Sequence, residues 1–104
     1  MRRPLDFTRI NAAALPALPA LCARWLPGGK RIGREYVALN PTRGDRRPGS
    51  FKVNLATGRW ADFATGDRGG DAVSLAAYLF GLRQSEAARR LAHALGVTME
   101  VRHG

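Results

Sequence analysis

Three aspartates stand close together around a glycine-rich stretch in the second half of the chain. Asp62, Asp67 and Asp71 all lie within residues 60–75. Clustered carboxylates can hold a catalytic metal ion, as they do in metal-dependent nucleases and transferases. No glutamate or histidine joins them near this stretch, and Asp71 directly precedes an apolar helical pattern, where a helix N-cap is expected. We therefore expect no metal site, no catalytic site and no enzyme activity in this chain.

The same stretch offers a second kind of chemistry through its backbone. Residues 65–71 read Thr-Gly-Asp-Arg-Gly-Gly-Asp, and a glycine-rich turn before a helix exposes N–H groups that can hold a phosphate. The Lys-Ser/Thr ending of a P-loop is absent. Asp71 would also repel an anion at the helix end. We favour the alternative, in which the glycines serve only to form the turn.

Basic residues are the more informative group. The chain has 104 residues, with 17 lysines and arginines against 8 aspartates and glutamates, and its formal net charge is +9. Only Lys30 and Lys52 are lysines. Arginine binds phosphate through two hydrogen bonds and stacks on bases, so this bias favours nucleic acid as the partner. The alternative is a solvated basic surface that reflects an arginine-rich genome.

Many of these charges fall on consecutive predicted elements. If Phe51 and Val53 face the core, Lys52 and Arg59 face outward from a hairpin, beside a basic loop. Basic surfaces with interleaved aromatic side chains hold single strands without sequence preference. The nucleic-acid-binding residues that we predict are Lys30, Arg31, Arg34, Tyr36, Arg43, Arg46, Arg47, Lys52, Arg59 and Trp60.

The hydrophobic pattern predicts helices at both ends of the chain. Leu18, Leu21, Cys22 and Trp25 repeat at helical spacing, which indicates a helix over 17–25 that packs on the core rather than binding a partner. Asp71 is expected to cap a helix over 72–80, with Val73, Ala76, Ala77 and Phe80 on its buried face. Ser85 is expected to cap a last helix that ends at Gly96.

The middle of the chain predicts a small antiparallel sheet. Strands are expected over 35–39, 51–55 and 59–63. Apolar and polar residues alternate over 51–55, and 59–63 is expected to return as its hairpin partner. Gly58 is expected to take a positive φ in the turn between the last two. The expected fold is therefore α+β, with a basic tail and helix region over 1–30, the main domain over 31–96 and a frayed tail over 97–104.

Cysteine content and hydropathy bear on the compartment. Cys22 is the only cysteine, so neither an internal disulfide nor a cysteine-based zinc site can form. The apolar run over 12–22 contains Pro16 and Pro19 and is far shorter than the ~20 residues of a membrane span. We predict a cytoplasmic protein without a membrane anchor.

Two motifs together resemble a known family. Pro48-Gly-Ser-Phe-Lys-Val53 is followed by an aromatic residue, a short knuckle and Gly69-Gly-Asp71 at the start of a helix. This order is similar to the CHC-type zinc finger at the front of bacterial and phage DNA primases. In that family a Cys-x-x-His pair precedes a Pro-Ser-Phe-x-Val strand, and a Cys-x-x-Cys knuckle follows a Tyr or Trp. The resemblance covers residues 35–96.

The resemblance extends to the order and spacing of these motifs and not to the metal ligands. With one residue inserted near Gly49 and one before Gly69, the four ligand positions fall on Asn40, Arg43, Asp62 and Thr65. Structural zinc requires thiolate and imidazole ligands, which these residues do not supply. The resemblance thus implies a zinc-ribbon-like sheet that forms without zinc and without any other cofactor.

The resemblance also implies a function. It suggests a non-catalytic module that binds single-stranded template DNA, with RNA as an alternative strand, in a primase or primase–helicase of a plasmid, phage or integrative element. The expected protein partner is a primase catalytic domain or a helicase, and the chain is either the front of a longer replication protein or a stand-alone accessory. The alternative is a protein-interaction adaptor that docks on a replication enzyme or a host factor.

Overall fold

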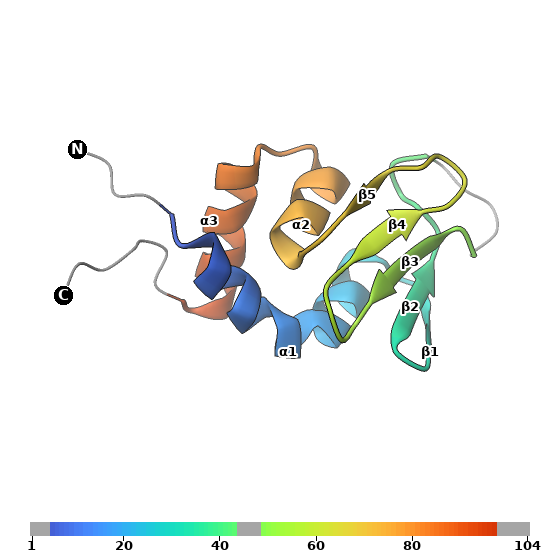
Figure 1. The fold of residues 1–104 in the computed structure, drawn as a ribbon, viewed down its shortest axis with the longest axis horizontal. Helices are drawn as coiled ribbons and strands as arrows, with labels where there is room; N and C mark the ends of the chain where they lie inside the picture. Colours follow the sequence, from blue (N-terminus) through green and yellow to red (C-terminus); the bar gives the residue numbers. More distant parts are fainter. Residues whose placement is uncertain (1–4, 44–48, 98–104) are drawn as a thin grey trace.

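The computed structural model describes residues 5–43 and 49–97, and it has an α+β fold in this part of the chain. An N-terminal helix precedes five short strands, and two helices follow them (Figure 1). This order confirms the predicted fold class. The elements are α1 (Phe7–Trp25), β1 (Lys30–Ile32), β2 (Glu35–Ala38), β3 (Phe51–Asn54), β4 (Trp60–Asp62), β5 (Arg68–Gly69), α2 (Ala72–Phe80) and α3 (Gln84–Leu95).

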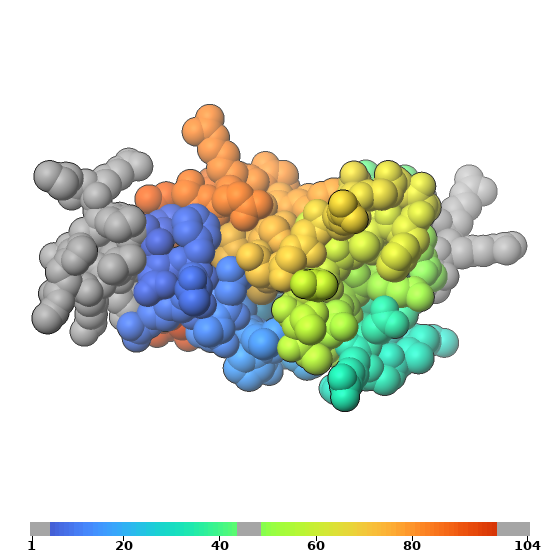
Figure 2. Space-filling model, in the orientation of Figure 1, coloured from blue at the N-terminus to red at the C-terminus, as the bar shows by residue number. Residues whose placement is uncertain are grey.

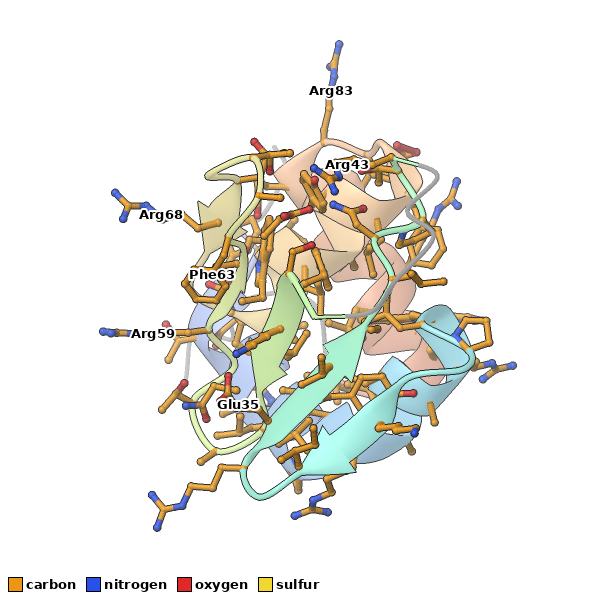
Figure 3. All side chains as sticks on the ribbon, turned by 90° about the vertical axis from the view of Figure 1, so that its right-hand side faces the viewer. Glu35, Arg43, Arg59, Phe63, Arg68 and Arg83 are labelled. Atoms are coloured by element: carbon orange, nitrogen blue, oxygen red, sulfur yellow. The ribbon has the colours of Figure 1, made fainter. Side chains whose placement is uncertain are left out.

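The five strands form one antiparallel sheet in which sequence neighbours are also spatial neighbours. The order is β1-β2-β3-β4-β5. Side chains alternate between the two faces, so Phe51 and Val53 of β3 are buried while Lys52 and Asn54 are not, as the sequence predicted. The helices lie behind one face of the sheet, and the opposite face is open in the view of Figure 3. A single core therefore lies between the sheet and the helices.

That core combines residues from both ends of the chain. Ile10 and Leu18 of α1 are 0% exposed, as are Phe51 of β3 and Leu75 of α2. All four belong to one hydrophobic cluster. In the space-filling view the helices and the sheet form one continuous body (Figure 2). The helix region predicted over 1–30 thus packs on the same core as the rest of the fold.

Helix α1 is longer than the sequence indicated. It begins after Asp6, whose carboxylate accepts a hydrogen bond of 2.9 Å from the backbone N–H of Arg9, and it continues through Pro16 and Pro19. Each proline removes a backbone hydrogen bond and crowds the preceding turn. The helix nevertheless continues because its buried stripe extends across both prolines, and its direction changes along its length (Figure 1). The predicted start at residue 17 was wrong.

Two strands were not predicted. β1 and β5 have three and two residues, and they form the two edges of the sheet. Neither has the apolar alternation that identifies a half-buried strand. Edge strands this short form because their backbones pair with the adjacent strand of the sheet. The turn between β3 and β4 was predicted correctly, with Gly58 at a φ of 84°.

The C-terminal helices agree in part with the prediction. Asp71 caps α2 by accepting a 2.8 Å hydrogen bond from the backbone N–H of Ser74, as predicted. Ser85 does not cap α3, because that helix begins at Gln84 and its N-cap residue, Arg83, makes no side-chain capping bond. Gly96 ends α3 as expected. Val97 is half-buried and donates to the carbonyl of Ala92, and the rest of the predicted tail lies outside the described residues.

Within the described residues, no helix has the length and apolar character needed to cross a membrane.

Candidate nucleic-acid interface

Two buried polar side chains lie at one end of the sheet, where β2 and β4 end. Asn40 follows β2, Asp62 is the last residue of β4, and both are 0% exposed. Nδ2 of Asn40 donates a hydrogen bond of 2.8 Å to Oδ2 of Asp62. Oδ1 of Asp62 accepts from the backbone N–H of Ala64 at 2.8 Å, and Nε of Arg43 lies 3.4 Å from Oδ2. The buried carboxylate is therefore both paired and hydrogen-bonded, which a buried charge requires.

Tyr78 of α2 connects this pair to the helices. Its hydroxyl accepts a hydrogen bond of 2.9 Å from Nδ2 of Asn40 and donates one of 2.8 Å to Oδ2 of Asp67. The Thr42 hydroxyl donates to Oδ1 of Asn40 at 2.7 Å. These bonds fix the loop after β2, the loop after β4 and α2 relative to one another. We call this group of six residues the polar cluster: Asn40, Thr42, Arg43, Asp62, Asp67 and Tyr78.

The polar cluster determines the ionisation of its central carboxylate. Burial by itself raises the pKa of Asp62. The hydrogen bond from Asn40, those from the backbone of Ala64 and Thr65, and the positive charge of Arg43 together outweigh that effect. The pKa of Asp62 thus lies below its ordinary value, and the side chain is an anion at neutral pH.

The four positions that correspond to zinc ligands in the resembling family lie together in this structure. Asn40 and Arg43 both contact the Asp62 carboxylate, and the backbone N–H of Thr65 donates to the Asp62 carbonyl at 3.3 Å. The Thr65 hydroxyl accepts from the backbone N–H of Asp67 at 3.2 Å. An ion pair and hydrogen bonds therefore occupy the place that the resemblance assigns to a metal ion.

The three aspartates have separate structural roles. Asp62 is buried in the polar cluster, Asp67 accepts from Tyr78, and Asp71 caps α2. In residues 5–43 and 49–97, no three histidine, cysteine, aspartate or glutamate side chains are placed to hold a metal ion together.

The open face of the sheet carries a regular arrangement of charge. Strand pairing aligns Lys30 with Val37, Val37 with Lys52, Lys52 with Ala61 and Ala61 with Arg68. One row thus crosses all five strands, and a cation stands on every second strand. Since neighbouring strands are ~4.8 Å apart, the cations are roughly 10 Å apart. We call Lys30, Val37, Lys52, Ala61 and Arg68 the basic row.

A shallow hollow of about 260 Å³ lies on the same face. Lys52, Arg59 and Arg68 supply its positive charge, and Glu35 is the one acidic side chain among its described lining residues. Phe63 stands at its edge with 72% of its surface exposed, and Nζ of Lys52 lies 5.7 Å from the centre of its ring (Figure 3). The hollow therefore combines cations with an aromatic ring that is open to solvent.

The exposed position of Phe63 follows from the two-residue alternation along β4. Trp60 and Asp62 point inward, so Arg59, Ala61 and Phe63 face outward. The signal was present in the sequence as this two-residue period, and Arg68 was missed because β5 was read as a loop.

Tyr36 and Trp60 were predicted as nucleic-acid-binding residues, but the structure buries both side chains. Tyr36 is 7% exposed and its hydroxyl donates a hydrogen bond of 2.9 Å to the carbonyl of Leu26. Trp60 is 5% exposed, and its Nε1 donates to Oγ of Ser74 at 3.0 Å. Both rings lie on the inward side of their strands, whereas the ring of Phe63 is exposed on the open face.

The predicted cations lie in several parts of the structure. Lys52 and Arg59 face outward from the hairpin as expected, and Lys30 lies on the same open face. Arg31 and Arg34 are exposed near the β1 edge, where Arg31 pairs with the inward-facing Tyr36 and its Nε donates to the carbonyl of Gly33. Arg43 contacts Asp62 in the polar cluster. The other two predicted residues, Arg46 and Arg47, lie outside the described residues.

Comparison with known proteins adds no relative: no protein-family model matches this chain, and no curated protein matches it either.

Proposed function

We propose that this chain binds a single strand of nucleic acid across the open face of its sheet. The observation that carries the proposal is the basic row, with Arg59 and Phe63 beside it at the two ends of β4. Cations at regular spacing follow a sugar–phosphate backbone, and an exposed ring offers a stacking surface for a base. A single strand fits this arrangement better than a duplex, because only unpaired bases have free faces to stack.

The charges on the open face set the expected salt dependence. Lys30, Lys52, Arg59 and Arg68 are four cations, and Glu35 is the acidic residue among them. If each cation neutralises one phosphate, log K falls with a slope of about −3 against log salt for a single strand. Stacking on Phe63 contributes a term that salt does not change.

The resemblance to the primase zinc finger suggests where such binding is used. We propose that the bound strand is template DNA, and that the chain acts as a non-catalytic module of a primase or primase–helicase from a mobile element. Its protein partner is then a primase catalytic domain or a helicase in the cytoplasm. The convergence of Asn40, Arg43, Asp62 and Thr65 at one end of the sheet supports this proposal.

Fluorescence anisotropy with a labelled oligothymidylate tests the binding proposal. Phe63→Ala should weaken binding by on the order of 1–3 kcal/mol with little change in the salt slope. The triple variant Lys52→Ala, Arg59→Ala and Arg68→Ala should reduce the magnitude of that slope by about 2. Glu35→Gln should strengthen binding, because it removes the negative charge in the hollow.

Arg89→Ala provides a matched control, since Arg89 is an exposed arginine on α3, away from the sheet. It should leave both the affinity and the salt slope unchanged. If Arg89→Ala weakened binding as much as Arg68→Ala, then the total charge of the protein, and not the open face, would hold the strand. A duplex that binds more tightly than the single strand would contradict the stacking role of Phe63.

A further inference from the structure

A second surface lies on the helical side of the molecule. The ends of α1 and α2 form a groove with the middle of α3, and its volume is about 290 Å³. A dry cavity of about 150 Å³ is enough for a benzene-sized ligand, so this groove has room for more than one apolar side chain. Its apolar lining includes Leu21, Trp25, Ala76, Phe80, Leu91 and Ala94. We call it the helical groove.

An aromatic pair forms part of this groove. The rings of Trp25 and Phe80 meet edge to face, with centroids 5.8 Å apart and an interplanar angle of 85°. Phe80 is nonetheless 52% exposed, although the sequence predicted it on the buried face of α2. Exposed aromatic residues beside a hydrophobic depression are typical anchors of protein–protein interfaces.

Among the described residues that line the groove, the two charged side chains are positive. Arg24 extends from α1 and Arg90 from α3. Arg90 has one ion-pair partner, Glu86, at 3.6 Å, and the two side chains are 67% and 50% exposed. An exposed pair of this kind is worth little, so Arg90 can exchange Glu86 for a carboxylate of a partner. An apolar floor between two arginines is complementary to an apolar stripe flanked by acidic residues.

We propose that the helical groove binds an acidic amphipathic helix of a partner protein. A helix satisfies its own backbone hydrogen bonds, whereas an extended peptide needs a free strand edge, and three helices offer none. A second copy of this chain is a poor occupant, because its net charge of +9 would oppose the same charge. Nucleic acid is also a poor occupant, since most of the lining is apolar.

The groove is lined by residues of the helices and the loop after α2, and the helices lie behind the sheet in Figure 3, whereas the basic row crosses the open face of the sheet. A partner helix and a nucleic-acid strand can therefore bind at the same time. Docking at the groove is independent of nucleic-acid binding, and each can fail without the other.

Two synthetic helical peptides of about 18 residues, long enough to form a helix in isolation, test the proposal. The first has leucines at i, i+3, i+4 and i+7 and glutamates elsewhere, and the second has lysine in place of each glutamate. The acidic peptide should bind at least about tenfold more tightly, as judged by fluorescence anisotropy. Phe80→Ala should weaken it by about 30-fold, as expected for a central aromatic anchor.

Two further variants make the test specific. Phe63→Ala removes the same side chain from the sheet face, and it should leave peptide affinity unchanged while it weakens oligothymidylate. Arg24→Glu with Arg90→Glu should reverse the preference between the two peptides. Circular dichroism confirms that each variant is folded.

Three results would overturn the proposal. The first is equal binding of both peptides, and the second is equal weakening by Phe80→Ala and Phe63→Ala. The third is a concentration-dependent dimer, detected by light scattering, that Phe80→Ala abolishes, since a second copy would then occupy the groove.

Discussion

Replacing Asp62 with alanine should destabilise the fold more than any other substitution in the polar cluster. The carboxylate is 0% exposed and accepts hydrogen bonds of 2.8 Å from both Asn40 and the backbone N–H of Ala64. Alanine removes both acceptors. The buried Asn40 donor left without a partner costs about 1–3 kcal/mol, whereas Ala64 is exposed and its N–H can bond to water at a smaller cost. The lost pairing with Arg43 adds less, because that side chain is 31% exposed and water screens it.

The sum is about 2–4 kcal/mol, with the buried Asn40 donor as the largest part. The free energy of unfolding of a domain is typically about 5–15 kcal/mol, so Asp62→Ala removes a large share of it. At about 4–8 °C per kcal/mol, the melting temperature should fall by at least about 8 °C.

Urea denaturation followed by circular dichroism measures this change directly. Asp62→Asn is the matched control, because it keeps the side-chain shape and an acceptor for the Ala64 N–H but loses the charge, and it should cost about 1–2 kcal/mol. The midpoint of the parent should be the same with and without EDTA, because hydrogen bonds and an ion pair connect the two loops. A cost below about 0.5 kcal/mol for Asp62→Ala, the range of a neutral surface change, would refute the structural role of the cluster.

Three further predictions follow from single residues. The pKa of Asp62 lies below its ordinary value, so the stability that this carboxylate contributes is present above its unfolded-state pKa and is lost as pH falls through its folded-state pKa. As the pH is lowered, the urea midpoint should therefore fall less steeply for Asp62→Asn than for the parent. Parallel curves for the two proteins would contradict this. A Cβ on Gly69 would lie too close to Nε1 of Trp60 and to Oγ of Ser74. Gly69→Ala should therefore displace the Trp60 ring and lower the thermal melting midpoint. An unchanged midpoint would argue against this packing. Burial raises the pKa of Cys22 to about 12, so a thiol reagent should label the native protein only as fast as the protein unfolds. Rapid labelling of the folded state would contradict the buried position of this thiol.

The sequence predicted those parts of the fold whose signals are local. The Asp71 cap, the end of α3 at Gly96 and the inward direction of Phe51 and Val53 all depend on residues within a few positions of one another. The continuation of α1 through Pro16 depends instead on packing against distant helices. That packing outweighs the local signal of a proline, and a single sequence does not reveal it.

The candidate site was predicted in outline and corrected in detail. Lys52 and Arg59 lie on the open face as expected, because the period of β3 was read correctly. The same alternation was not followed along β4, where Trp60 falls on an inward position and Phe63 on an outward one. The place of Arg68 on the open face depends on its pairing with Ala61 of β4, a contact that only the folded sheet creates.

Tyr78 could not have been identified from the sequence. It lies within an apolar helical pattern, where a tyrosine is usually a core residue, and its hydroxyl meets Asn40 and Asp67 from distant parts of the chain. The ligand-like positions Asn40 and Asp62 were identified only by their resemblance to a metal site. Their hydrogen bond gives them a structural role that residue type alone did not indicate.

The most direct test of the central claim is an NMR titration of the isotopically labelled chain with an unlabelled oligothymidylate. If the strand lies across the open face, amide shifts should concentrate on the basic row and on Phe63, at Lys30, Lys52, Ala61, Phe63 and Arg68. The amides of α1 and α3 should be unaffected. Shifts confined to the helices, or no shifts at low salt, would contradict the account.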